Sequence, residues 1–172
     1  MRVFTHSRCS GRLAVFLTVV SVVVLVDQAT KAAVRYIAPV GTQARSLIPG
    51  LVDLWHIENT GAAFSLGEGA APVFVLLALA VLVASLILIT KQALPFFLVI
   101  SLACVAGGGV GNMVDRLVSG SVTDFLSLVF INFPVFNVAD MFVTVGVIVT
   151  FIGYITWDSK RQAVLTTSNE DH

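Results

Sequence analysis

The distribution of apolar and polar residues divides the chain into four long uncharged stretches and the polar segments between them. Stretches of this kind can cross a hydrocarbon core of about 30 Å as α-helices, which rise about 1.5 Å per residue. The pattern therefore predicts an all-α membrane protein, folded as a single domain over residues 1–172. Its four transmembrane helices are expected at about residues 13–30, 70–90, 92–114 and 138–157, followed by a flexible C-terminal tail over about residues 160–172.

The first stretch also has the composition of a cleavable signal peptide. Leu13–Val26 is uncharged and follows several arginines, like the apolar region of such a peptide. However, Asp27 and Lys31 come directly after it, where a cleavage site would require small residues. We therefore interpret the stretch as a retained first transmembrane helix, in which Asp27 and Lys31 form an i, i+4 ion pair with a structural role.

Two longer connections, residues 27–69 and 115–136, contain most of the polar side chains that lie between the apolar stretches. In the first connection, Leu51–Ile57 alternates apolar and polar residues as a strand does. The tripeptides IPG and NTG, which flank this segment, are typical of turns. We therefore expect a small extracytoplasmic β platform at the membrane surface.

Lysine and arginine residues indicate the orientation, because they concentrate in the cytoplasmic segments of membrane proteins. More of them fall on the side of the two termini than on the side of the long connections. Both termini are therefore expected in the cytoplasm, with the polar connections at the outer, periplasmic face. The first group is Arg2, Arg8, Arg12, Lys91, Lys160 and Arg161, and the second is Lys31, Arg35, Arg45 and Arg116.

Composition supports a membrane protein and excludes several functions. Hydrophobic residues make up 57% of the chain and charged residues 12%, unlike the composition of soluble domains. A formal net charge of zero offers no basic surface for nucleic acid. Cys9 and Cys104 are expected as free thiols, and the polar sequence before Cys9 excludes a lipidated N-terminus. The histidines are scattered without an HExxH motif, so neither a metal nor an organic cofactor is expected.

Asp140 is the only charged residue between Asp124 and Asp158. An ionised carboxylate at membrane depth costs at least about 2.5 kcal/mol, so its presence requires an explanation. Pro134 prevents a helix upstream, and Asn137 is suited to cap the helix that follows, which places Asp140 in the first helical turn. Asp140 is therefore either a functional group or a carboxylate that complements the positive end of the helix dipole.

A second carboxylate favours the functional interpretation. Asp124 begins the same uncharged stretch, and a turn at residues 132–134 would allow it to fold back beside Asp140. At a separation of about 4 Å and an effective dielectric constant of about 20, ionising both would cost about 4 kcal/mol, or about three pKa units. The pair would then share one proton near neutral pH. Aspartyl peptidases require this state, because the carboxylate activates water while the acid protonates the amide oxygen.

Other polar and small residues surround these two aspartates in the sequence. The glycines of the GGGVG segment, residues 107–111, are suited either to close helix packing or to a site at which another backbone approaches. Asn112, Asp115 and Arg116 are spaced to share one face of a helix, although Arg116 is equally suited to be an interfacial anchor. Asn59 offers an uncharged donor and acceptor, or forms an ordinary turn with Gly61.

Taken together, four motifs resemble those of the bacterial lipoprotein signal peptidases, also called signal peptidase II. The resemblance covers about residues 13–157, and the last two motifs are the specific ones. The motifs are DQATK (Asp27–Lys31), ENTGAAFS (Glu58–Ser65), GGGVGNMVDRLVSGSVTDF (Gly107–Phe125) and FNVAD (Phe136–Asp140). The segment GGGVGN replaces the GGALGN common in the family, a difference that affects packing only.

The resemblance implies a role for each matching residue of a membrane-embedded aspartyl endopeptidase. Asp124, in the G-x-V-x-D element, and Asp140, in the F-N-x-A-D element, would be the catalytic pair, with Asp115 as the main competitor. Asp27 and Lys31 would have a stabilising role. The residues expected to bind substrate or support the catalytic pair are Asn59, Gly108, Asn112, Asp115, Arg116 and Asn137.

The resemblance also implies the substrate and the setting. The substrate would be a prolipoprotein whose cysteine already carries diacylglycerol, cut just before that cysteine. The enzyme would lie in the bacterial cytoplasmic (inner) membrane as a monomer, in contact with membrane lipid, with its active site near the outer face. The strand region at Leu51–Ile57 would form an outer cradle that clamps the substrate.

Three other functions fit parts of the pattern. A proton-coupled transporter would use intramembrane acids, but its polar groups would extend through the depth of several helices. A presenilin-type peptidase would require a G-x-G-D element, where this chain has GVGN. A non-catalytic membrane assembly factor remains an alternative, which the effect of Asp124→Asn on cleavage would distinguish.

Overall fold

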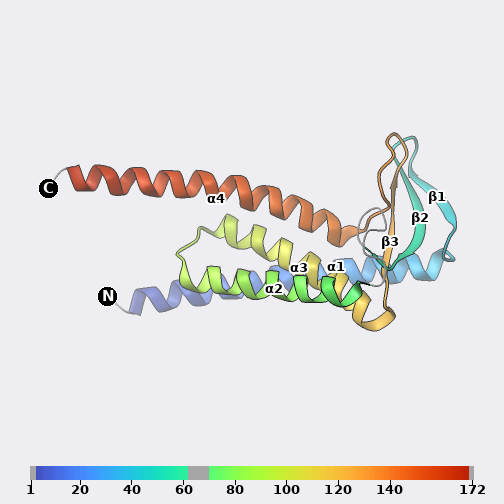
Figure 1. Cartoon of the computed structure of the whole chain (residues 1–172), viewed down its shortest axis with the longest axis horizontal. Coiled ribbons are helices and arrows are strands. Elements are labelled where there is room, and N and C mark those ends of the chain that lie inside the picture. The colour runs from blue at the N-terminus through green and yellow to red at the C-terminus, as the bar shows by residue number, and fades with distance from the viewer. Residues whose placement is uncertain (1–2, 62–69, 171–172) are drawn as a thin grey trace.

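The computed structural model describes residues 3–61 and 70–170. Four helices, all long and apolar enough to cross a membrane, run side by side, and both termini lie at the end opposite a small sheet (Figure 1). This arrangement confirms the predicted four-helix membrane fold with a β platform. In chain order the elements are α1 (Val3–Ile37), β1 (Gln43–Ile48), β2 (Val52–Asn59), α2 (Ala71–Lys91), α3 (Phe96–Ser119), β3 (Val122–Leu128) and α4 (Val138–Glu170).

Two of the helices are much longer than the apolar pattern predicts. α1 continues from the membrane stretch through Asp27 and Lys31 to Ile37, because both charged side chains are buried in the protein rather than exposed to lipid. α4 continues to Glu170, so residues 160–170, which the sequence assigns to a flexible tail, belong to this helix. α3 begins after Pro95 and ends at Gly120, whose φ of 77° is the left-handed conformation that glycine adopts most readily.

The glycine cluster of α3 allows the other helices to approach its backbone. A Cβ atom added at Gly107 would lie 2.9 Å from Val23 of α1, and one at Gly108 would lie 2.5 Å from the Ala139 carbonyl oxygen of α4. Gly109 faces Ala78 of α2 at an ordinary contact distance of 3.6 Å. These glycines thus pack α3 against the other helices, and at Gly108 the close neighbour is the backbone of α4. α3 forms the centre of the bundle.

The sheet contains three antiparallel strands in the order β1-β2-β3. The sequence predicts only the middle strand, β2, together with its turn at Gly50, which has a φ of 75°. The register pairs Ile57 with Asp124. After β3 the chain turns back, and an antiparallel bridge joins Leu126 to Phe136, directly before α4. Both aspartates of interest therefore lie where the sheet meets the helices.

Candidate active site

A cleft of about 720 Å³ opens between the helices and the sheet. α2, α3 and α4 contribute mostly apolar side chains to its walls, including Leu77, Val105 and Val143. Its polar lining comes mainly from residues at the end next to the sheet. These residues are Asn59, Asn112, Arg116, Asp124 and Asp140.

Asp140 enters the cleft from the first turn of α4. Asn137 immediately precedes this helix, and its side-chain oxygen accepts a hydrogen bond from the Asp140 N–H at 3.1 Å. In return, Asp140 Oδ2 accepts a hydrogen bond from the Asn137 N–H at 3.0 Å. This reciprocal arrangement is a capping box, which fixes the start of the helix and the orientation of the carboxylate. Oδ1 of Asp140 takes no part in the capping box. Asp140 can therefore cap the helix and also have a functional role.

Asp124 lies in β3, and its side chain is only 3% exposed. Its two oxygens accept hydrogen bonds from uncharged amides: Asn59 Nδ2 lies 2.9 Å from Oδ2, and Asn137 Nδ2 lies 2.6 Å from Oδ1. Asn59 belongs to β2 and also closes a turn by accepting the Gly61 N–H at 2.9 Å. Asn59 therefore has both of the roles considered from the sequence: it forms a turn with Gly61, and it donates a hydrogen bond to Asp124.

Asparagine side chains join the two carboxylates. Asn137 contacts both aspartates, and Asn112 Nδ2 donates to Asp140 Oδ1 at 2.8 Å. Asn137 Nδ2 also donates to Asn112 Oδ1 at 3.1 Å. Within the described residues, neither aspartate forms an ion pair. We call this group of residues the amide cluster: Asn59, Asn112, Asp124, Asn137 and Asp140.

The environment of the amide cluster favours a bound proton. Burial raises the pKa of Asp124 from its ordinary range to about 7, and the nearby Asp140 carboxylate also acts to raise it. Hydrogen bonds from Asn59 and Asn137 and the charge of Lys31 act in the opposite direction. Near neutral pH, the pair can therefore present one carboxylic acid and one carboxylate to the cleft.

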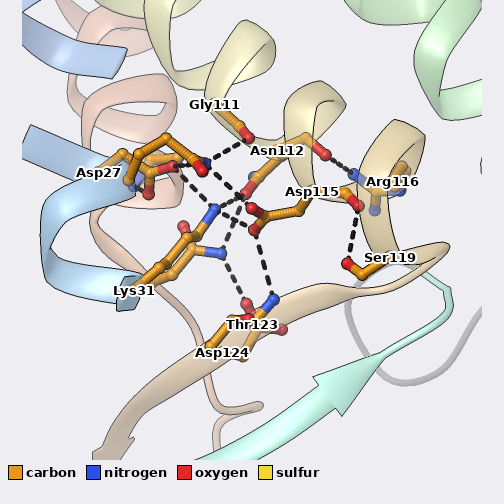
Figure 2. A network of polar contacts seen from close by, with 12 residues as sticks. Asp27, Lys31, Gly111, Asn112, Asp115, Arg116, Ser119, Thr123 and Asp124 are labelled. Atoms are coloured by element: carbon orange, nitrogen blue, oxygen red, sulfur yellow. Dashed lines mark hydrogen bonds and ion pairs between the residues drawn. The ribbon is translucent and has the colours of Figure 1, made fainter. Parts of the chain in front are cut away.

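A second group of charged side chains, most of them buried, lies beside the amide cluster (Figure 2). Lys31 Nζ lies 2.8 Å from Asp27 Oδ2 and 2.8 Å from Asp115 Oδ2, and Asp27 and Lys31 are fully buried. Arg35 Nη1 lies 3.9 Å from Asp115 Oδ1, so two cations face two carboxylates. We call Asp27, Lys31, Arg35 and Asp115 the ionic cluster.

The ionic cluster connects three helices to one another. Asp27 Oδ1 accepts a hydrogen bond from the Ala139 N–H at 3.0 Å, which joins α1 to the start of α4. Gly111 of α3 lies against the same side chain, because a Cβ there would be 2.5 Å from Asp27 Oδ2. The predicted ion pair of Asp27 and Lys31 is present, and it is part of a buried tertiary contact rather than a local pair at a helix end.

The structure separates residues that the helical spacing places on one face. Asn112 and Arg116 line the cleft, whereas Asp115 points to Lys31 and accepts the Thr123 N–H at 3.4 Å. Arg116 donates to the Gly61 carbonyl oxygen at 2.8 Å and lies over the Phe74 ring at 4.7 Å. It is therefore held in the cleft by protein groups.

Several residues of these networks are missed by the sequence analysis. Gln28 Nε2 lies within hydrogen-bond distance of Asp27, Asp115 and the Gly111 carbonyl oxygen. Arg35 donates to Thr123 Oγ1 at 2.9 Å, next to Asp124 in β3. The sequence gives one indication of the role of Gln28, which is its position within the DQATK motif.

Glu58 forms a further link between β2 and β3. Its carboxylate accepts hydrogen bonds from Ser121 Oγ at 2.6 Å and Thr123 Oγ1 at 3.1 Å, and His56 Nε2 lies 3.2 Å away. This network lies beside Asn59 and the start of β3, where it fixes the two strands that present Asn59 and Asp124.

Ala62–Ser65 of the ENTGAAFS motif lie outside the described residues. Within the described ones, no group of three or more His, Cys, Asp and Glu side chains is arranged to hold a metal ion.

Known proteins with a similar sequence or structure are consistent with this geometry. Residues 19–156 match the family described as Signal peptidase (SPase) II. The lipoprotein signal peptidase of Parasynechococcus marenigrum (strain WH8102) is 41% identical over 153 residues, which cover 88% of this chain and 94% of the relative. That of Streptococcus pneumoniae (strain ATCC BAA-255 / R6) is 36% identical over 143 residues, covering 83% and 93%. A bacterial membrane enzyme solved by the in meso method at 2.3 Å has a TM-score of 0.78 at 28% identity, covering 84% of this chain and 90% of that one.

Proposed function

The chain belongs to the signal peptidase II family of aspartic peptidases, and from this premise we propose that it removes signal peptides from prolipoproteins with Asp124 and Asp140 as its catalytic pair. One observation carries the assignment of the pair. Both carboxylates line one cleft, share amide partners and lack an ion-paired cation among the described residues. Asp115 lacks this environment, because Lys31 and Arg35 neutralise it away from the cleft.

The roles of the two carboxylates follow from their surroundings. Asp124, with a pKa raised to about 7, carries the shared proton. The Asp140 carboxylate takes a proton from the water that attacks the scissile carbonyl carbon, while Asp124 protonates the carbonyl oxygen. When the tetrahedral intermediate collapses, Asp124 takes back the proton from its hydroxyl group, and Asp140 gives the proton that it took from water to the departing amine. No step requires a metal or an organic cofactor.

The shape of the cleft supports a lipid-linked peptide as substrate. Apolar side chains of α2, α3 and α4 continue from the two aspartates into the membrane region, so an apolar signal helix and acyl chains would remain among them. The polar end would hold the scissile bond beside the pair, just before a diacylglyceryl-modified cysteine. Arg116 lines the same cleft and would contact the peptide or the lipid ester next to the cleaved bond.

The distribution of basic residues supports an outward-facing site in the cytoplasmic membrane. The termini lie at the end of the bundle opposite the sheet (Figure 1). On the sheet side, Lys31, Arg35 and Arg116 are bound to protein groups, so they say little about loop charge. The larger number of basic residues at the end with the termini favours cytoplasmic termini. A monomer is the expected oligomeric state.

Incubation of the purified protein with two matched precursors tests this function. One precursor carries diacylglycerol on its cysteine, and the other has the same peptide sequence without lipid. We expect cleavage of the lipidated precursor just before its cysteine, loss of that cleavage in Asp124→Asn, and little cleavage of the unlipidated precursor. Equal cleavage of both would contradict the lipid requirement. Cleavage of neither by a folded preparation would contradict the peptidase function.

A further inference from the structure

The sheet exposes a group of large apolar side chains at the end that lies away from Asn59. Two turns contribute to it: the β1–β2 turn and the segment that follows β3. Each of these side chains is between 48% and 60% exposed. We call the group the apolar tip: Leu47, Ile48, Leu51, Val129, Phe130, Ile131 and Phe133.

The two turns form one structural unit. The Leu51 N–H donates to the Ile48 carbonyl oxygen at 3.0 Å, which closes the β1–β2 turn. The Leu51 carbonyl oxygen accepts the Val129 N–H, also at 3.0 Å, so the second turn is joined to the first. Residues 46–52 and 125–139 contain no charged side chain. The apolar tip is therefore a single uncharged surface rather than scattered exposed residues.

The position of the apolar tip indicates what covers it. The sheet lies across the ends of the helices, and its two turns project beyond the start of α4 (Figure 1). The tip is also continuous with the cleft, because Phe133 lines the cleft and its ring packs edge-on against Phe136 with ring centroids 5.8 Å apart. An apolar surface that overhangs membrane-spanning helices in this way lies next to the lipid that surrounds them.

We propose that the apolar tip inserts into the lipid leaflet beside α4 and anchors the sheet to the membrane. Contiguous apolar patches are rarely left exposed to water, and aromatic side chains are enriched at the membrane interface. Insertion holds β3, and with it Asp124, at a fixed depth relative to the bilayer. It also surrounds the cleft next to the tip with lipid, so a membrane-bound substrate reaches the aspartates without crossing water.

Quenching by lipid-attached probes tests insertion independently of catalysis. Phe130 and Val40 are matched positions, because they are 60% and 59% exposed, and Val40 lies outside the tip in the α1–β1 connection. Each is replaced by cysteine in a Cys9→Ser/Cys104→Ala background, labelled with an environment-sensitive fluorophore and reconstituted in vesicles that contain spin-labelled phosphatidylcholine. We expect quenching at position 130 to exceed that at position 40 at least about threefold.

Two outcomes would overturn the proposal. Equal quenching at positions 130 and 40 would show that the tip does not enter the lipid. Quenching or self-quenching at position 130 that appears only at a high protein-to-lipid ratio would instead assign the tip to contact with a second copy of the chain. Quenching at position 130 that does not depend on protein density would support insertion.

A pair of charge substitutions tests the consequence for the reaction. Phe130→Asp should raise the KM for a vesicle-embedded precursor several-fold and leave the kcat/KM measured in detergent micelles within about twofold of the unmodified protein. Val40→Asp, at matched exposure, should leave both values unchanged. An equal loss in vesicles and micelles would overturn membrane anchoring, because it would show that Phe130 acts on the cleft itself. This test rests on the proposed function, whereas the quenching test does not.

Discussion

The ionic cluster and the amide cluster use the same acidic residue type and have opposite properties. Each contains two aspartates that are connected through a shared polar residue. In the ionic cluster the connecting residue is Lys31, which lies 2.8 Å from both carboxylates. In the amide cluster the connecting residue is Asn137, which is neutral and contacts both carboxylates.

This difference in the connecting residue separates stability from reactivity. A lysine between two carboxylates balances their charge through ion pairs that hold the surrounding helices together. Asparagines satisfy hydrogen bonds without neutralising charge, so repulsion and burial favour one shared proton. Two neighbouring aspartates are therefore insufficient to identify a catalytic pair, and the charge of their common partner is decisive.

Asn112 connects the two clusters. Its Oδ1 accepts a hydrogen bond from Lys31 Nζ at 2.8 Å, and its Nδ2 donates to Asp140 Oδ1 at 2.8 Å. The ionic cluster thus fixes which way the Asn112 amide points, and this orientation presents a donor to Asp140. The stable cluster positions the reactive one.

The largest effect is expected from neutralising either member of the amide cluster pair. Asp124→Asn or Asp140→Asn should reduce kcat at least about 10³-fold, because the remaining carboxylic group cannot provide both general acid and general base. Cleavage of the lipidated precursor measures this loss, and thermal unfolding checks that the variants remain folded. Retention of more than about a tenth of the activity by either variant would contradict the assignment.

Removal of the cation from the ionic cluster should mainly affect stability. Lys31→Met leaves Asp27 and Asp115 buried without their common partner, which should lower the free energy of unfolding by about 3–5 kcal/mol. Thermal or denaturant unfolding in micelles measures the change. The triple variant Asp27→Asn/Lys31→Met/Asp115→Asn is the control, and it should recover part of the loss. A Lys31→Met protein that is as stable as the parent but inactive would instead place Lys31 in the chemistry.

Two glycines of α3 provide a matched test of how closely the ionic cluster is packed. Gly111→Ala would place a Cβ 2.5 Å from Asp27 Oδ2, and it should destabilise the protein by about 1–3 kcal/mol. Gly109→Ala would place a Cβ 3.6 Å from Ala78, an ordinary contact, and should have little effect on stability. The comparison is made by thermal unfolding. Equal destabilisation by both substitutions would contradict the close packing of Asp27 against α3.

The smallest expected effect concerns the pH dependence of the amide cluster. Activity should fall as pH rises through about 7, because Asp124 then loses the shared proton. Asn59 donates to the ionised form of Asp124 and lowers its pKa, so Asn59→Ala should move this alkaline limb upward by about 0.5–1 pH unit. The pH profile of kcat measures the shift, with the exposed neighbour Thr60→Ala as control. A downward shift would contradict the role of this hydrogen bond.

The same ionisation makes stability depend on pH. The pKa of Asp124 is higher in the folded protein than in the unfolded chain, so its protonated form favours folding. This contribution is complete below the ordinary aspartate range and is lost as pH rises to about 7. Asp124→Asn, which cannot ionise, should therefore gain stability relative to the parent as pH rises through this window. Thermal unfolding across the same window measures the difference.

The helices and the catalytic candidates can be predicted from sequence because each depends on local signals. Long uncharged stretches identify the four spans. The spacing of Pro134, Asn137 and Asp140 identifies the start of α4, and the structure confirms it as a capping box. The family motifs contain all ten residues assigned to the site, although their catalytic and binding roles remain predictions.

The remaining features depend on contacts between distant segments. β3 contains no regular alternation, because its first four residues are all buried and Phe125 belongs to a core cluster with Val34 of α1 and Ala38, which follows α1. The extension of α1 to Ile37 is possible only because Asp115 and Ala139 bind its charged residues. Helical spacing alone could not predict that Asp115 points away from the cleft that Asn112 and Arg116 line. The direction of each side chain depends on a partner from another part of the chain.

Infrared spectroscopy of the protein with carboxyl-labelled aspartate tests most directly whether the amide cluster holds the shared proton. We predict a protonated aspartic acid band that disappears as pH rises through about 7, is absent in Asp124→Asn, and persists in Asp115→Asn. A band that persists in Asp124→Asn and is lost in Asp115→Asn would contradict the account, because the proton would then belong to the ionic cluster.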